Sequence, residues 1–248
     1  MGAYTFAFFI GTALHEFGHA IALVAFGVDQ YKVVIHPFLG CYTSWSLNNE
    51  YIGYVDAAGP LFNMLMGVTL LVVFWQRRQT VIPSVLLMGP VALIQEGFNS
   101  LIQVALGVTG SDSLRIIAAG VPWVVLVTVD LLLFCLGVYI LAIELPLYGV
   151  SSCDGLLDKI AVVVPGFVGY MAAIYIYNII FNPMGATRGL VLMVFSGLIA
   201  VLVAFIYSLV VNRVNFLRFD VVQRDLRTLL MVWGLTMLAL FLGLLFFN

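Results

Sequence analysis

Apolar runs long enough to cross a lipid bilayer recur along almost the whole chain. Charged residues make up only 9% of it, against roughly 25% in soluble domains, and the mean hydropathy is +1.14. A water-facing surface cannot be covered with so few charges. A membrane-spanning helix needs about 20 apolar residues, and we expect spans at residues 3–27, 57–75, 81–108, 121–145, 160–181, 190–211 and 229–247. The sequence therefore predicts an all-α polytopic membrane protein with six or seven transmembrane helices.

The stretch between the first two expected spans, residues 29–55, breaks this apolar pattern. Its β-branched and aromatic residues form three short runs that are separated by turn-forming residues. The runs are 31–35, 41–45 and 51–55. We predict a small β-hairpin or sheet at the membrane surface. We divide the chain into a membrane core, residues 1–145, and additional transmembrane helices, residues 146–248.

Positively charged residues are distributed unevenly between the expected loops. With seven spans, seven Lys and Arg fall on the side of the N-terminus and three on the other. The first group is Arg77, Arg78, Lys159, Arg213, Arg218, Arg224 and Arg227, and the second is Lys32, Arg115 and Arg188. Cytoplasmic loops carry an excess of positive residues, so we expect a cytoplasmic N-terminus in a multi-pass integral membrane protein. No basic segment precedes the first span, which we expect to act as its own signal anchor.

The first expected span contains an H-E-x-x-H pattern formed by His15, Glu16 and His19. Residues four apart share one face of a helix, so both imidazoles can bind one metal ion. Glu16 lies one position further round the helix, where a general base is needed to take a proton from water. Titratable groups inside a span are costly and are functional by default. The pattern therefore predicts a metal site with an adjacent base.

Two histidines do not complete such a site, because catalytic zinc has three protein ligands and one open position. The residues alone leave the third ligand open between Asp112, Glu96, Asp56, Asp130 and His36. Asp112 reaches the mid-span histidines only if the glycine-containing segment 107–110 turns back into the membrane, as irregular backbone can where it lines a cavity. For His36 we favour a surface loop, and for Asp130 a polar contact between helices.

Two other expected spans carry a row of polar or small residues spaced four apart. The rows are Gly59, Asn63 and Gly67, and Gln95, Asn99 and Gln103. Polar rows inside spans face other helices or a water-filled cavity rather than lipid. Asn63 and Asn99 are therefore candidates for holding a substrate or a developing oxyanion.

Three segments together resemble a known family. They are H-E-F-G-H within a span at 15–19, A-A-G-P-L-F-N opening the next at 57–63, and an Asn at 99 followed later by the segment 111–116. They are similar to the site-2 protease family of intramembrane zinc metalloproteases (peptidase family M50). The resemblance covers roughly residues 11–116 and implies a site-2-protease-like core.

In that core the resemblance implies that His15, His19 and Asp112 bind zinc and that Glu16 is the catalytic base. Ser113 stands where the family usually has Gly after its Asp. The family's Pro between the Asn and the Asp is also missing, and the gap between them is longer. Glu96 stays as the alternative third ligand.

The resulting hypothesis is a zinc metalloendopeptidase that hydrolyses peptide bonds of transmembrane protein substrates within the lipid bilayer. A catalytically inactive relative that binds membrane proteins or acts like a chaperone is one alternative. An ion-coupled transporter that uses intramembrane acids is another, although the sequence has no internal repeat of the transporter type. A net charge of −2 without a basic run argues against nucleic acid as a partner. A regulatory membrane partner is compatible with the sequence.

Overall fold

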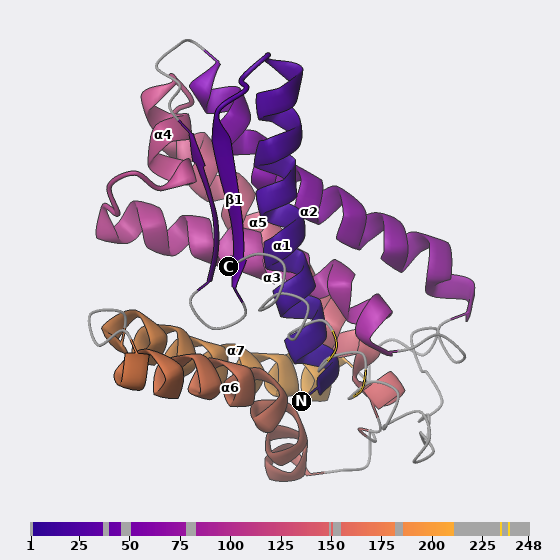
Figure 1. Cartoon of the computed structure of the whole chain (residues 1–248). Coiled ribbons are helices and arrows are strands. Elements are labelled where there is room, and N and C mark those ends of the chain that lie inside the picture. The colour runs from indigo at the N-terminus through magenta and orange to yellow at the C-terminus, as the bar shows by residue number, and fades with distance from the viewer. Residues whose placement is uncertain are drawn as a thin grey trace.

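The computed structural model describes residues 2–36, 40–45, 51–77, 83–148, 150, 155–181 and 186–210, together with Gly234 and Leu238. This part of the chain is mainly helical, with one two-stranded sheet (Figure 1). The elements in order are α1 (Gly2–Ala25), β1 (Tyr31–His36), β2 (Gly40–Trp45), α2 (Ile52–Phe74), η1 (Trp75–Arg77), α3 (Pro83–Leu106), α4 (Asp112–Ala118), α5 (Trp123–Glu144), η2 (Leu145–Tyr148), α6 (Leu156–Phe181) and α7 (Ala186–Val210).

Four helical segments of the described chain are long and apolar enough to cross a membrane, which identifies a helical membrane protein. They are Ala3–Ala25, Ile52–Phe74, Ser84–Leu106 and Trp123–Leu147. The prediction of six or seven spans is thus confirmed for four. Helices α6 and α7 cover the fifth and sixth expected spans, but some of their side chains lie outside the described part. The seventh expected span, 229–247, lies outside it apart from Gly234 and Leu238.

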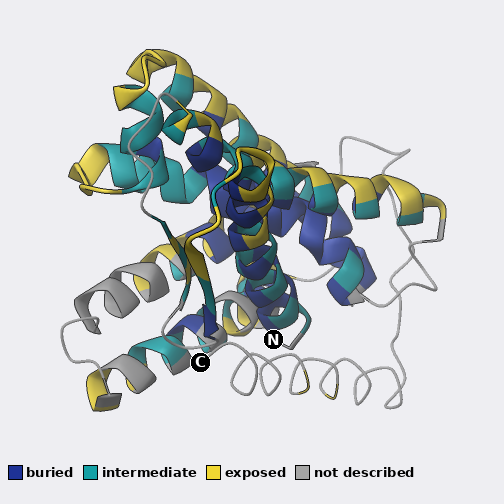
Figure 2. Cartoon of the chain, turned by 45° about the horizontal axis from the view of Figure 1, so that its top comes forward, coloured by how far each residue is buried: buried dark blue, intermediate teal, exposed yellow. Residues whose placement is uncertain are grey.

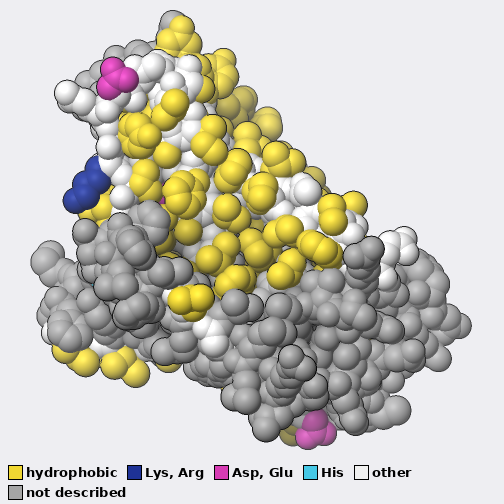
Figure 3. Space-filling model, turned by 45° about the vertical axis from the view of Figure 1, so that its right-hand side comes forward, with side chains coloured by type: hydrophobic (Ala, Val, Ile, Leu, Met, Phe, Trp, Pro, Cys, Tyr) yellow, Lys and Arg dark blue, Asp and Glu magenta, His cyan; other side chains and the backbone are white. Residues whose placement is uncertain are grey.

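The outward faces of these helices are apolar. Leu61, Leu65 and Val72 on α2, and Leu131 and Leu132 on α5, are each at least half exposed. Figure 3 shows one face of the molecule on which hydrophobic side chains form a broad surface with few charged ones. Such a surface is unfavourable in water and favourable in lipid. Several polar side chains of the spans, among them His19, Asn63 and Glu96, are instead buried between helices, and Figure 2 shows the buried positions along α1 and α3.

Helix α1 lies at the centre and packs against both α2 and α3. Glycines allow the close approach that membrane helices need. A Cβ atom at Gly18 would lie 2.4 Å from the Ala58 carbonyl oxygen on α2, and one at Gly11 would lie 3.1 Å from the Gln95 amide oxygen on α3. On α2 the predicted row of Gly59, Asn63 and Gly67 is indeed buried, because that face of the helix turns toward α1 and α3.

The predicted hairpin is formed by β1 and β2, which pair antiparallel with Val33 opposite Thr43 (Figure 1). Both strands lie along α1. Successive strand residues point to opposite faces, so Cys41, Thr43 and Trp45 are partly buried while Tyr42 and Ser44 are exposed. The expectation of a third β run at 51–55 is wrong. Tyr51 precedes α2, and residues 52–55 form its first turn, because packing against α1 outweighs their β propensity.

The connection between α3 and α4 turns the chain back on itself. Gly107 and Gly110 have φ values of 61° and 78°, which glycine adopts without strain. This confirms the irregular backbone expected at residues 107–110. Ser113, in the first turn of α4, lies beside Ser100 and Gln103 of α3. The chain has therefore returned alongside the last two turns of α3, and this return brings Asp112 to α1.

Candidate metal centre

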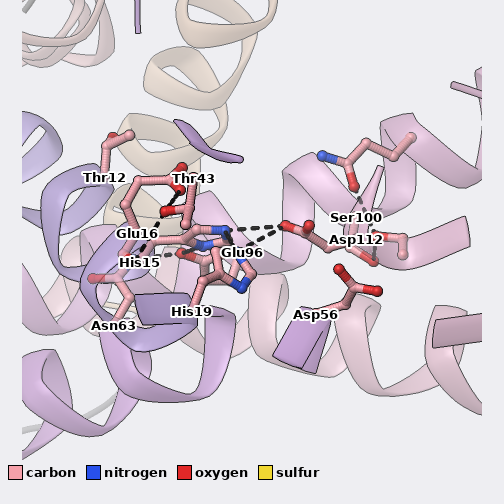
Figure 4. A network of polar contacts seen from close by, with 12 residues as sticks. Thr12, His15, Glu16, His19, Thr43, Asp56, Asn63, Glu96, Ser100 and Asp112 are labelled. Carbon is pink, nitrogen blue, oxygen red and sulfur yellow. Dashed lines mark hydrogen bonds and ion pairs between the residues drawn. The ribbon is translucent and has the colours of Figure 1, made fainter. Parts of the chain in front are cut away.

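Three side-chain atoms from two distant parts of the chain converge at the middle of α1 (Figure 4). The Nε2 atoms of His15 and His19 lie 3.1 Å apart. The Oδ2 atom of Asp112 lies 3.1 Å from the first and 3.5 Å from the second. His19 is buried, and His15 and Asp112 are half-buried. The structure thus brings together the three residues that the family resemblance implies as ligands.

The outer nitrogen of each imidazole is held by an acceptor. His19 Nδ1 donates to the Val55 carbonyl oxygen at 2.7 Å. His15 Nδ1 faces both carboxylate oxygens of Glu96, at 3.0 and 3.1 Å. A carbonyl and a carboxylate accept hydrogen bonds, so the neutral imidazoles carry their hydrogen on Nδ1. Both Nε2 lone pairs then point at each other and at the Asp112 carboxylate, an arrangement that requires a cation or an added proton between them.

The spacing of these atoms fits a tetrahedral metal ion. Zinc bonds of about 2.05 Å place two ligand atoms of a tetrahedron about 3.3 Å apart, and the three observed separations are 3.1, 3.1 and 3.5 Å. Two neutral imidazoles and one carboxylate are a donor set that zinc accepts. Hydrogen-bonded outer nitrogens are also typical of metal-binding histidines. The residues present therefore fit the metal that the sequence predicts.

The carboxyl group of Asp112 is suited to remain ionised. Burial alone would raise its pKa, but when the Nε2 atoms of His15 and His19 carry a proton, their contacts with the carboxylate outweigh burial and hold the pKa well below its usual range. Ser111 occupies the N-cap position and Asp112 begins the helix, which leaves the Asp112 side chain free to turn toward α1.

An ion pair between Arg115 and Asp56 holds α4 to α2 next to this cluster. Arg115 Nη1 donates to the Oδ1 atom of Asp56 at 3.1 Å. Its Nη2 atom donates to the Gly110 carbonyl oxygen, and its guanidinium lies 5.1 Å from the centre of the Trp45 ring. Asp56 is fully buried on α2. Asp56 is thus engaged with Arg115 and does not belong to the His–His–Asp cluster.

The side chain of Glu16 is directed by the hairpin. Thr43 Oγ1, on β2, lies 2.8 Å from Glu16 Oε2 and 3.2 Å from the Glu16 carbonyl oxygen. Thr43 has one hydroxyl hydrogen, so it donates to one of these acceptors at a time. Either bond ties β2 to the helical turn that carries Glu16. The second carboxylate oxygen of Glu16 has no such tie to Thr43.

Space beside the histidines is provided by a single glycine of α2. A Cβ atom at Gly59 would lie 2.4 Å from His19 Nε2 and 3.0 Å from His15 Cδ2. Contacts below 3.0 Å are not tolerated without a shift of the backbone or the imidazole. The Gly of the A-A-G-P segment is therefore needed for the imidazoles to lie against α2.

The other residues considered from the sequence lie around the cluster rather than in it. Asn63 Nδ2 donates to Glu96 Oε1 at 2.5 Å, so the amide holds the carboxylate behind His15. Asn99 is half-buried on α3 and takes part in none of the contacts described around the histidines. Asp130 accepts a hydrogen bond from Ser100, as expected for a contact between helices. The preference for a surface loop at His36 is wrong: His36 is the last residue of β1, where it pairs with Gly40, and it is buried, which lowers its pKa.

Sequence reasoning missed four groups that shape this site. They are Thr43, Trp45, Arg115 and the Val55 carbonyl oxygen. Asp56 and Arg115 carry a detectable signal, since opposite charges in an apolar chain must find partners. Thr43 and the Val55 carbonyl carry none, because strand and backbone contacts with another helix leave no periodic pattern.

Comparison with protein-family models, with curated proteins and with solved structures finds no match for this chain.

Proposed function

We propose that the protein is an intramembrane zinc metalloprotease that hydrolyses peptide bonds of membrane-embedded proteins. The observation that carries the proposal is the triangle of His15 Nε2, His19 Nε2 and Asp112 Oδ2, with edges of 3.1, 3.1 and 3.5 Å, two corners of which lie in the apolar helix α1. Glu16, adjacent to His15 in the same helix, supplies the base. The similarity of these segments to the site-2 protease family supports the same activity.

Each residue has a defined part in this proposal. Zinc, when bound, acts as a Lewis acid that makes water a stronger nucleophile and polarises the scissile carbonyl. Asp112 is the third ligand, since Glu96 faces the opposite nitrogen of His15. Glu16 accepts a proton from the attacking water and passes it to the leaving amine. Thr43 holds one Glu16 oxygen at 2.8 Å, which leaves the other to receive that proton.

The substrate must present an extended backbone, because the carbonyls of a helix are already hydrogen-bonded. A two-stranded sheet has an unpaired edge on each strand, and an extended peptide can add to such an edge. We propose that the hairpin of β1 and β2 receives the unwound substrate beside Glu16. Deleting residues 41–45 without loss of cleavage would remove this step while leaving the zinc site in place.

The decisive experiment is Glu16→Gln in purified protein in detergent or liposomes. The variant should bind zinc in the same stoichiometry as the wild type, and cleavage of a reconstituted transmembrane substrate should fall by at least about 10³-fold, because the base is lost. Asp112→Ala should lose zinc, measured by elemental analysis, while Glu96→Ala should retain part of it. Asp158→Asn, at an exposed acid of α6, serves as the matched control and should leave both properties unchanged.

Two results would contradict the proposal. Wild-type protein that contains no stoichiometric metal and takes up none on titration would show that a proton, not a cation, sits between the imidazoles. Cleavage that survives Glu16→Gln would exclude Glu16 as the base.

The membrane arrangement beyond the four spans is also a proposal. We infer that α6, α7 and residues 229–247 cross the bilayer as well, with the N-terminus in the cytoplasm as the excess of Lys and Arg predicts. An epitope tag at the N-terminus should then resist protease added outside intact cells. Digestion of that tag by external protease would reverse the orientation.

A further inference from the structure

A row of hydrogen-bonded polar side chains connects α5, α3 and α4. It lies on the side of Asp112 that faces away from α1. Ser113 Oγ lies 2.8 Å from Ser100 Oγ and 2.8 Å from Gln103 Oε1. Ser100 Oγ in turn donates to Asp130 Oδ2. Ser113 immediately follows Asp112 in the first turn of α4, and Asp130 belongs to α5. None of these four side chains contributes to the proposed reaction.

The donors and acceptors in this row of side chains can be assigned in only one way. The Asp130 carboxylate can only accept hydrogen bonds, so Ser100 must donate its single hydroxyl hydrogen to Asp130. Ser100 then has lone pairs available to accept from Ser113. The oxygen and nitrogen of a side-chain amide are interchangeable by rotation, so Gln103 can donate to Ser113 from the other side. Each hydroxyl hydrogen then has an acceptor, and the first turn of α4 is joined to α3 and α5.

The position of Asp130 indicates that this row of hydrogen bonds has a function beyond helix packing. The side chain is only 6% exposed, within a candidate membrane span. A carboxylate at such a place is costly, and apolar residues would pack the helices without that cost. Gly97 permits the contact, because a Cβ atom there would lie 2.4 Å from the Asp130 carbonyl oxygen. Ser100, three residues later, faces the same way and meets the carboxylate.

We propose that Asp130 is a positioning residue that acts through Ser100 and Ser113 to hold Asp112 toward His15 and His19. The proposal rests on the metal centre proposed above. It also gives a reason for the departure of this chain from the family pattern. Where the family usually has Gly after its Asp, Ser113 supplies the hydroxyl through which α5 reaches α4. Without this hydroxyl, the Arg115–Asp56 pair still holds α4 to α2 on its other side.

The test is a double-mutant cycle on metal affinity, which does not depend on catalysis. Ser113→Ala and Asp130→Leu should each weaken zinc binding about tenfold, as loss of outer contacts to a metal ligand does. The double variant should be no weaker than either single one, because both changes break the same row of hydrogen bonds. Asp130→Asn keeps an acceptor for Ser100 and should retain most of the affinity. The absorption bands of bound Co²⁺ should shift in Ser113→Ala, since Asp112 is no longer fixed.

Controls separate positioning from general destabilisation. Thr128→Val, also on α5, removes an exposed hydroxyl that donates to the Val124 carbonyl oxygen of its own helix, and it should change nothing. The melting temperature of the metal-free Ser113→Ala protein should stay within a few degrees of the wild type. If Asp130→Leu does not fold, the zinc affinities of Ser113→Ala and Asp130→Asn alone decide whether Asp130 positions Asp112.

The outcomes distinguish this inference from the proposed function. If wild-type protein binds zinc and Ser113→Ala binds it equally well with an unchanged Co²⁺ spectrum, the positioning role of Asp130 is overturned and the metal centre stands. If the two single effects add fully in the double variant, Asp130 does not act through Ser113, which also overturns the inference. If wild-type protein binds no metal, the proposed function itself fails.

Discussion

The Nδ1 atom of His15 lies 3.0 Å from a carboxylate oxygen of Glu96, on the opposite side of the imidazole from Asp112. A carboxylate in this position fixes the orientation and tautomer of a histidine and increases its basicity toward a metal. Asn63 holds the same carboxylate from α2. Helices α1, α2 and α3 thus together determine the direction in which the Nε2 atom of His15 points.

Replacing Glu96 by Gln tests this support. The amide can still accept a hydrogen bond from His15, but it removes the charge that strengthens the imidazole as a ligand. Zinc affinity should fall by about 10- to 100-fold with one ion still bound at saturation, measured by competition with a chelator. A complete loss of stoichiometric zinc, equal to that of Asp112→Ala, would instead make Glu96 the third ligand.

A methyl group at Gly59 should damage the site by volume alone. The added Cβ atom would lie 2.4 Å from His19 Nε2, so the imidazole or the α2 backbone must move. We expect Gly59→Ala to weaken zinc binding by more than about tenfold, since the displaced imidazole loses the orientation that a metal ligand needs. Gly197→Ala on α7 is the matched control, because its Cβ atom would make an ordinary contact of 3.5 Å with Val168. Unchanged affinity in Gly59→Ala would show that the two helices separate easily.

The contribution of the hairpin to the proposed base, Glu16, can be measured at Thr43. Thr43→Val keeps the shape but removes the hydroxyl that bonds to Glu16. The turnover number should fall about three- to tenfold, the value of one hydrogen bond, with zinc content unchanged. Thr43→Ser restores the donor and should restore turnover. An equal loss in both variants would assign the effect to strand packing rather than to the hydroxyl.

The Arg115–Asp56 pair should contribute to stability as well as to the site. Asp56 is fully buried, so Arg115→Met leaves a carboxylate without its cation. We expect a loss of about 2 kcal/mol, read as a lower melting temperature in detergent. Adding Asp56→Asn should recover part of this loss, because the unpaired charge is removed. A double variant as unstable as the sum of the two single variants would show that the residues do not act as a pair.

The sequence was sufficient for features with a regular spacing. The four-residue interval of His15 and His19, and that of Gly59, Asn63 and Gly67, follows from helix geometry and is found in the structure. Gly107 and Gly110 indicated a break that the positive φ values confirm. These features depend only on residues close together in the chain.

Features that depend on contacts between distant segments could not be predicted from the spacing of residues in the sequence. The sequence offered both Glu96 and Asp112 as third ligand, since only the three-dimensional fold decides which nitrogen of His15 each one faces. The run 51–55 has strand-forming residues, yet residues 52–55 begin α2, because packing of that helix against α1 outweighs their β propensity. Whether six or seven spans exist stays a prediction.

His19 of α1 and Asp112 of α4 are separated by more than ninety residues of the chain. A membrane protein is inserted segment by segment from its N-terminus, so a newly made chain first presents a pair of imidazoles without a third donor. Such a pair holds zinc weakly. At the proposed zinc site, tight binding of the metal then requires that α4 has folded back against α1, α2 and α3, so a bound ion would mark the assembly of these helices.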